Sequence, residues 1–86
     1  MVFYSEHSCE VCADAELELQ SFGIEYVKYF ITASAYPNLI LIWRNGESTM
    51  IPRTAIPYVP ALFDKEKNFL ICGLEGISNY LRKVND

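Results

Sequence analysis

Cys9 and Cys12 are separated by two residues and follow closely behind the short apolar run Val2-Phe3-Tyr4. Thiols at this spacing can close into a small disulfide and reopen, and beside a βαβ pattern they are typical of thiol redox chemistry. At a helix start, the first thiol lies near unpaired backbone N–H groups and the positive end of the helix dipole, which favour a thiolate. We therefore expect Cys9 to attack a substrate disulfide and Cys12, one turn further in, to resolve the mixed disulfide.

Two ionisable neighbours are expected to tune the first thiol in opposite directions. A protonated His7 would favour the Cys9 thiolate and could donate a proton near neutral pH; the alternative is that His7 is only an exposed loop residue. Glu10 places a negative charge beside Cys9, and a neighbouring carboxylate disfavours a second negative charge.

Composition predicts one small domain covering residues 1–86. The chain has 7 Lys and Arg residues against 11 Asp and Glu, a formal net charge of −4, and the basic residues are scattered. We therefore expect no nucleic-acid partner. No segment approaches the roughly 20 apolar residues of a membrane span, and the first residues lack the features of a signal peptide. An odd number of cysteines argues against a secreted disulfide scaffold, so we expect a cytoplasmic monomer in which Cys72 stays a thiol.

The elements that position the dithiol follow from periodicity. A helix is expected from about Glu10 to Phe22, ended by Gly23, and a strand over 24–31 parallel to the first. Apolar runs at 58–63 and 69–72, separated by a charged turn, predict an antiparallel hairpin. Apolar residues at i, i+3, i+4 and i+7 predict a closing amphipathic helix that contains Ile77, Tyr80, Leu81 and Val84.

The middle of the chain admits two interpretations. Tyr36, Leu39, Ile40 and Trp43 recur at helical spacing after Pro37 and before Asn45-Gly46, which favours a helix. The same Asn45-Gly46 between residues 39–43 and 48–51 also fits a hairpin with a two-residue turn. We favour the helix, followed by a loop over 47–56. The expected order is then β-α-β-(α)-β-β-α, an α/β fold with a four-stranded mixed sheet flanked by helices.

Three local motifs together resemble the glutaredoxin branch of the thioredoxin superfamily: Tyr4-Ser5 before the Cys9–Cys12 pair, Val59-Pro60 at a strand start, and Ile71-Cys72-Gly73 before the last helix. The resemblance implies a thioredoxin/glutaredoxin-like fold and a dithiol–disulfide oxidoreductase that acts as an electron carrier. It also implies that Pro60 is cis and lies against the dithiol. The implied substrate-binding residues are Tyr58, Val59, Pro60, Gly73 and Glu75.

The chain departs from that family around the dithiol. Glu10 and Val11 replace the usual proline and tyrosine, and the lysine expected shortly before the cysteines is missing. Two substrate classes are therefore open. One is glutathione mixed disulfides, with glutathione as co-substrate and no bound cofactor. The other is a protein disulfide such as that of ribonucleotide reductase. Glutathione or a thioredoxin reductase would supply the electrons.

Two non-enzymatic alternatives also remain. His7, Cys9, Cys12 and Cys72 could bind zinc as a Cys3His set if the last strand brings Cys72 close to the dithiol. Alternatively the domain could be a binding module without turnover, with Tyr36, Trp43 and Tyr58 as its partner surface.

Overall fold

Strands and helices occupy most of the chain in the computed structural model, which describes residues 1–44 and 46–84. The elements, in chain order, are β1 (Val2–Ser5), α1 (Glu10–Ser21), β2 (Val27–Thr32), β3 (Leu39–Arg44), β4 (Glu47–Pro52), a 3₁₀ helix η1 (Arg53–Ala55), β5 (Ala61–Asp64), β6 (Phe69–Cys72) and α2 (Leu74–Val84). Both expected helices and the expected strands outside residues 36–56 are therefore present, with boundaries shifted by up to three residues.

The sheet corrects the predicted fold class. It is one mixed sheet of six strands in the order β4-β3-β2-β1-β5-β6, carrying two α-helices, so the four-stranded thioredoxin-like sheet is wrong. Among the described strands, β1 and β2 alone run parallel; the other neighbouring strands are antiparallel. The α/β class and the β1-α1-β2 crossover are confirmed.

The difference comes from residues 39–52, which form the β3–β4 hairpin in place of the favoured helix and the expected loop. Ile40 and Ile42 are buried and alternate with more exposed residues, which is the period of a strand. β3 pairs along β2, and thereby satisfies an edge of unpaired backbone groups that a helix would have left open. Gly46, with φ of +81°, lies in the connection between the two strands. Asn45, the other expected turn residue, lies outside the described residues.

Each face of the sheet has its own apolar cluster. On the helix face, Phe3 and Leu62 from the sheet are fully buried against Leu19 of α1 and Leu81 of α2. On the opposite face, a second buried cluster consists of Ile31, Ile40, Ile42, Ile56 and Ala61. The segment after η1 supplies Ile56 and therefore covers that face.

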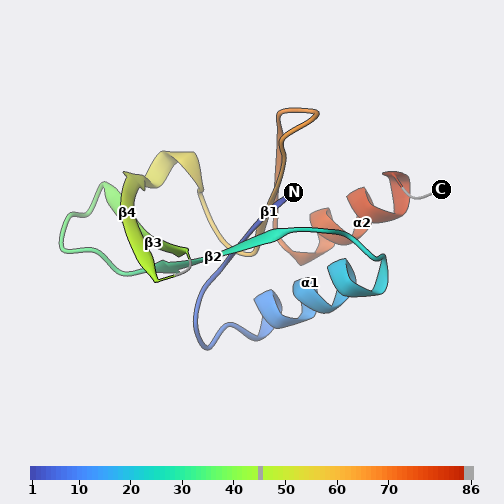
Figure 1. The fold of residues 1–86 in the computed structure, drawn as a ribbon, viewed down its shortest axis with the longest axis horizontal. Coiled ribbons are helices and arrows are strands. Elements are labelled where there is room, and N and C mark those ends of the chain that lie inside the picture. Colours follow the sequence, from blue (N-terminus) through green and yellow to red (C-terminus); the bar gives the residue numbers. More distant parts are fainter. Residues whose placement is uncertain (45, 85–86) are drawn as a thin grey trace.

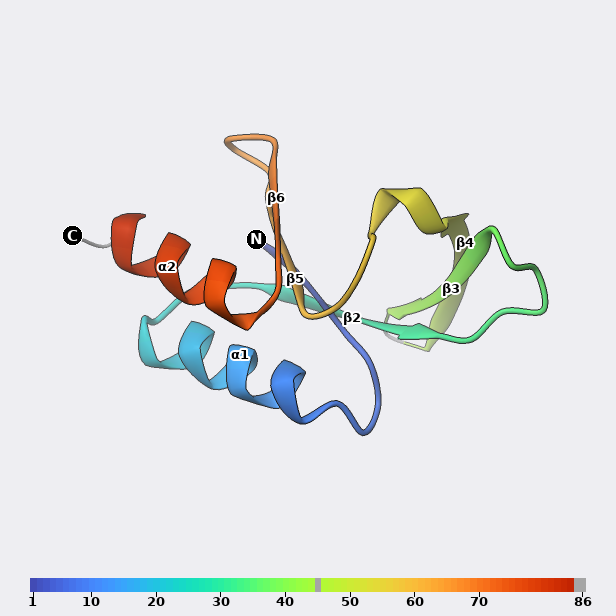
Figure 2. The ribbon, with the colours of Figure 1, turned by 180° about the vertical axis from the view of Figure 1, so that it is seen from behind.

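The two helices contact each other and lie on the same side of the sheet (Figures 1 and 2). The Ser78 hydroxyl of α2 donates a hydrogen bond of 3.3 Å to the Glu18 carboxylate of α1. The β3–β4 hairpin lies at the other end of the molecule from α2, and the principal extents are 42 × 25 × 22 Å (Figure 1). Consequently the helices leave the hairpin uncovered, and the start of α1 faces it. No helix in the described part of the chain is long and apolar enough to span a membrane.

Candidate active site

The cysteine pair lies where the chain leaves β1 and enters α1. Ser8 has φ of +59°, a left-handed turn that reverses the chain, and Cys9 then caps the helix. The Cys9 sulfur accepts a hydrogen bond of 3.1 Å from the Cys12 backbone N–H, which is one of the unpaired donors of the first helical turn. The same sulfur forms a disulfide with Cys12. Cys9 is partly exposed, whereas only 1% of Cys12 is exposed.

This arrangement gives the two thiols different environments. A negative sulfur at position 9 would keep the N–H contact and lie at the positive end of the helix dipole, two features that favour a thiolate. Cys12 is enclosed, and from the interior it can reach only Cys9 among the described cysteines, since Cys72 belongs to the other sheet face. This difference in accessibility is what the roles of attacking and resolving thiol require, and the roles themselves stay predictions.

A cavity of about 510 Å³ opens beside Cys9. The side chains around it come from the β1–α1 loop, the first turns of α1 and the middle of β2; they are Ser5, Glu6, His7, Ser8, Cys9, Glu10, Ala13, Glu16, Lys28 and Phe30. Its volume lies within the usual range of ligand sites, about 300–1,000 Å³. Cys9 thus faces a space that a substrate can enter.

Electrostatics of this cavity are dominated by carboxylates. Glu16 pairs with the Lys28 ammonium at 2.7 Å and also accepts a hydrogen bond of 2.8 Å from the Tyr26 hydroxyl. Partial burial opposes ionisation of Glu16, but these two hydrogen bonds outweigh it and lower the pKa of Glu16 below its ordinary value. Lys28 also lies over the Phe30 ring, 4.6 Å from its centroid.

Both residues predicted to tune Cys9 lie at this cavity. His7 stacks on Phe30, with ring centroids 4.3 Å apart and planes 3° from parallel, and Glu10 is the first residue of α1. His7 is exposed, but the stacking holds its ring beside the dithiol. The predicted opposing effects of His7 and Glu10 stay predictions.

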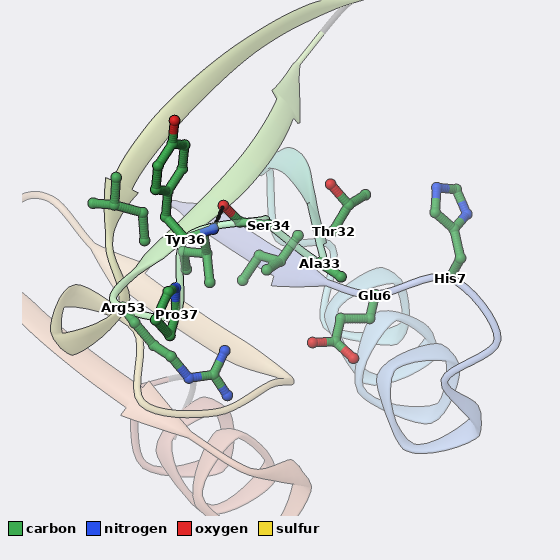
Figure 3. A pocket seen from close by; sticks show the side chains of 11 residues that line it. Glu6, His7, Thr32, Ala33, Ser34, Tyr36, Pro37 and Arg53 are labelled. Carbon is green, nitrogen blue, oxygen red and sulfur yellow. Dashed lines mark hydrogen bonds between the residues drawn. The ribbon is translucent and has the colours of Figure 1, made fainter.

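A second cavity of about 550 Å³ adjoins the first, because Glu6 and His7 line both. The remaining lining comes from the end of β2, the loop into β3, the start of β3 and Arg53 of η1. Figure 3 shows the Glu6 carboxylate and the Arg53 guanidinium extending into the same space. The loop is held by hydrogen bonds from the Tyr36 N–H to the Ser34 hydroxyl, 3.1 Å, and from the Arg53 N–H to the Asn38 carbonyl, 3.0 Å.

The five residues predicted to bind substrate lie elsewhere, before the start of β5 and where β6 leads into α2. The Val59–Pro60 bond is cis, which confirms that part of the expectation. Since Tyr4 pairs with Ala61, the antiparallel register puts Pro60 beside Ser5, at the end of β1 that leads to the dithiol. The Gly73 N–H donates a 2.7 Å hydrogen bond to the Pro60 carbonyl.

The same group includes Tyr58, whose ring lies next to Gly73, and Glu75, which is exposed in the first turn of α2. Thus Tyr58, Pro60 and Gly73 are brought together by the structure. None of the five residues lines either cavity at the dithiol among the described residues, so their binding role stays a prediction.

Cys72 does not join the dithiol. Its side chain packs against the apolar cluster on the sheet face opposite the helices, and burial raises the pKa of its thiol, although the Tyr58 backbone N–H opposes that shift. The zinc alternative required Cys72 near Cys9 and Cys12, and this position removes it from the proposed ligand set. Among the described residues, no three His, Cys, Asp or Glu side chains are grouped as metal ligands.

Aromatic residues of the binding-module alternative are exposed but dispersed. Tyr36 lies in the β2–β3 loop, Trp43 on β3 and Tyr58 before β5, each at least 40% exposed. Tyr36 lines the second cavity, and the Trp43 ring N–H donates a hydrogen bond of 3.2 Å to the Thr32 hydroxyl. The three residues therefore come from three separate segments, and the binding-module alternative stays a prediction.

Sequence reasoning missed the contribution of β2 to the site. Phe3 pairs with Lys28 and Ser5 with Phe30, so Lys28 and Phe30 share the helix face and border Cys9. The parallel pairing of the two predicted strands contained this signal, since alternate residues of paired strands share a face. Glu6 was also missed, because its role depends on a loop conformation.

Comparisons of the chain with protein-family models, with curated proteins and with solved structures found no match.

Proposed function

We propose that the protein is a dithiol–disulfide oxidoreductase in which Cys9 and Cys12 cycle between dithiol and disulfide. The observation that carries the proposal is the asymmetry of the pair: an accessible Cys9 sulfur on a helix N-terminus, facing a cavity, bonded to an enclosed Cys12. The resemblance to glutaredoxins supports it through local motifs alone, because the six-stranded sheet differs from the sheet of that family.

The reaction consists of two thiol–disulfide exchanges. The Cys9 thiolate attacks one sulfur of the substrate disulfide, the substrate S–S bond breaks, and the other substrate sulfur leaves and takes a proton from water. Cys12 then loses its proton and attacks the Cys9 sulfur, which releases the first substrate sulfur as a thiol. Two electrons pass to the substrate, and the protein keeps the Cys9–Cys12 disulfide.

A thiol reductant must restore the dithiol for turnover. Glutathione or a thioredoxin reductase are the proposed sources of electrons, and protein disulfides, such as that of ribonucleotide reductase, or glutathione mixed disulfides are the proposed substrates. The same proposal places the protein in the cytoplasm, where thiols stay reduced, and has it act as a monomer.

The test is stoichiometric oxidation of the reduced protein. After reduction and removal of the reductant, the protein is mixed with bis(2-hydroxyethyl) disulfide. Its remaining thiols are then alkylated, and mass spectrometry of the protein counts them. The wild type should lose two thiols and produce two equivalents of mercaptoethanol, and Cys72→Ser should do the same. Failure of the wild type to oxidise, or equal oxidation in Cys9→Ser, would refute the proposal.

A further inference from the structure

The dithiol cavity has an excess of negative charge. Three carboxylates line it, from Glu6, Glu10 and Glu16, and Lys28 is the one lysine or arginine among its lining residues. Lys28 is already paired with Glu16 at 2.7 Å, and no ion pair between described residues involves Glu6 or Glu10. A substrate that reaches Cys9 therefore meets the exposed Glu10 carboxylate, which forms no ion pair with a described residue. At the junction with the second cavity it meets the exposed Glu6 carboxylate, which extends into the space that the Arg53 guanidinium also enters (Figure 3).

The site also extends beyond the space that a small disulfide fills. The two cavities, about 510 and 550 Å³, meet at Glu6 and His7, which line both; Phe30 borders the first on the helix face of the sheet, and Ile31 and Ile40 border the second on the opposite face. The stacked rings of His7 and Phe30 border the first cavity, and the second contains the Arg53 guanidinium, a donor suited to carbonyl oxygens. A chain with alternating polar and apolar groups fits this lining.

We propose that the dithiol acts on disulfides in polypeptides that carry a lysine or arginine next to the reacting cysteine. The substrate chain would continue over His7 into the second cavity, and its cationic side chains would face Glu10 at the dithiol and Glu6 at the junction of the two cavities. This inference rests on the proposed function and specifies its substrate class. Two opposite unit charges about 4 Å apart in water change an association constant roughly fivefold, and like charges oppose it by the same factor.

The experiment compares two synthetic peptide disulfides that differ only in having lysine or glutamate beside each cysteine. The second-order rate constant for oxidation of the reduced protein is measured with each peptide, and with bis(2-hydroxyethyl) disulfide as an uncharged reference. The lysine peptide should react about tenfold faster than the glutamate peptide at 10 mM salt, and the ratio should approach one at 1 M salt, where the Debye length is about 3 Å. A lysine peptide shortened to the residues flanking its cysteines should react several-fold more slowly than the full peptide.

Charge variants identify the residues responsible. Glu6→Gln and Glu10→Gln should each reduce the lysine-to-glutamate ratio about threefold, a measure that cancels any general change in Cys9 reactivity. Glu66→Gln is the matched control, since Glu66 lies in the β5–β6 turn at the end of the sheet away from Cys9, and it should leave the ratio unchanged.

Two different failures can be told apart. If none of the tested disulfides, including the uncharged reference, oxidises the reduced protein, the proposed function itself is wrong. The substrate class is wrong, and the proposed function stands, if the uncharged disulfide reacts but the lysine and glutamate peptides react at equal rates at low salt. The same conclusion follows if Glu6→Gln and Glu10→Gln both have the lysine-to-glutamate ratio of Glu66→Gln. Equal rates for the full and shortened lysine peptides would contradict the use of the second cavity.

Discussion

At the scale of single residues, the position of each thiol on α1 decides its chemistry. Cys9 caps the helix and accepts the Cys12 N–H at 3.1 Å, whereas Cys12 is 1% exposed. Cys72 has a buried environment that raises the pKa of its thiol, so it is less reactive near neutral pH. The three cysteines should therefore differ in reactivity, with Cys9 first.

Replacing Cys12 with serine should trap the intermediate. Cys9 can still attack in Cys12→Ser, but nothing resolves the mixed disulfide, so close to one substrate adduct per molecule should accumulate on Cys9. Peptide mapping by mass spectrometry locates the adduct. Cys9→Ser is the matched variant and should collect no adduct at Cys12, because that thiol is enclosed. An adduct on Cys12 would reverse the assigned roles.

Charges beside Cys9 should shift its reactivity by a fraction of a pH unit. Glu10 lies in the first turn of α1, where a carboxylate competes with the thiolate for the same positive potential, an effect of about 0.3–1 kcal/mol. In a Cys12→Ser, Cys72→Ser background, Glu10→Gln should move the midpoint of pH-dependent alkylation of Cys9 downward, by about 0.2–0.7 pH unit. His7→Ala should move it upward. Shifts in the opposite directions would show that these side chains do not act through charge on Cys9.

At the scale of secondary structure, local pattern was sufficient at both ends of the chain and insufficient in the middle. Cys9 as a helix cap and the short charged turn between β5 and β6 are local signals, and both are confirmed. The apolar residues of segment 36–52 fit two spacings at once. Tyr36, Leu39, Ile40 and Trp43 recur at helical spacing, whereas Ile40 and Ile42 alternate as in a strand. The free edge of β2 selects the strand, and that edge exists only after the sheet has formed. The cavity likewise depends on pairing, since β2 brings Lys28 and Phe30 to Cys9.

The β3–β4 hairpin should be sensitive to the backbone at Gly46. Its φ of +81° is disfavoured for residues with a Cβ, and a Cβ added there meets nothing within 4 Å, so any cost belongs to the backbone alone. Gly46→Ala should lower the free energy of unfolding by about 1 kcal/mol. Gly46→Asn should lower it less, because asparagine tolerates left-handed backbone. Urea unfolding measures both variants, and an unchanged midpoint in Gly46→Ala would contradict the hairpin geometry.

At the scale of the whole molecule, the dithiol and the contacts between α2 and the β5–β6 hairpin lie at different ends. The dithiol faces the β3–β4 end, whereas the opposite end is closed by contacts between α2 and the β5–β6 hairpin (Figure 2). There the Tyr80 hydroxyl donates a 2.6 Å hydrogen bond to the Asp64 carboxylate, and the Tyr80 ring stacks on Phe69 at 5.8 Å between centroids. Asp64 also accepts the backbone N–H groups of Glu66 and Lys67, which fix the turn. Changes at this end should alter folding stability without altering the charge around Cys9.

The Tyr80–Asp64 hydrogen bond should make stability depend on pH at both extremes. It lowers the pKa of Asp64 below its ordinary 3.8, so its stabilisation is present above that pH and is lost as the pH falls through the lowered value. The same bond raises the pKa of Tyr80 from 10.0 to about 12, so that contribution is complete below pH 10 and is lost between pH 10 and about 12. Tyr80→Phe should lower the free energy of unfolding at pH 7 and reduce its dependence on pH in both the acid and the alkaline range.

Burial also raises the pKa values of Tyr4 and Tyr26, so part of the dependence of stability on alkaline pH should remain. Urea unfolding from pH 2.5 to 12 tests this, with the exposed Tyr36→Phe as control; identical pH profiles for Tyr80→Phe and Tyr36→Phe would show that the bond does not contribute.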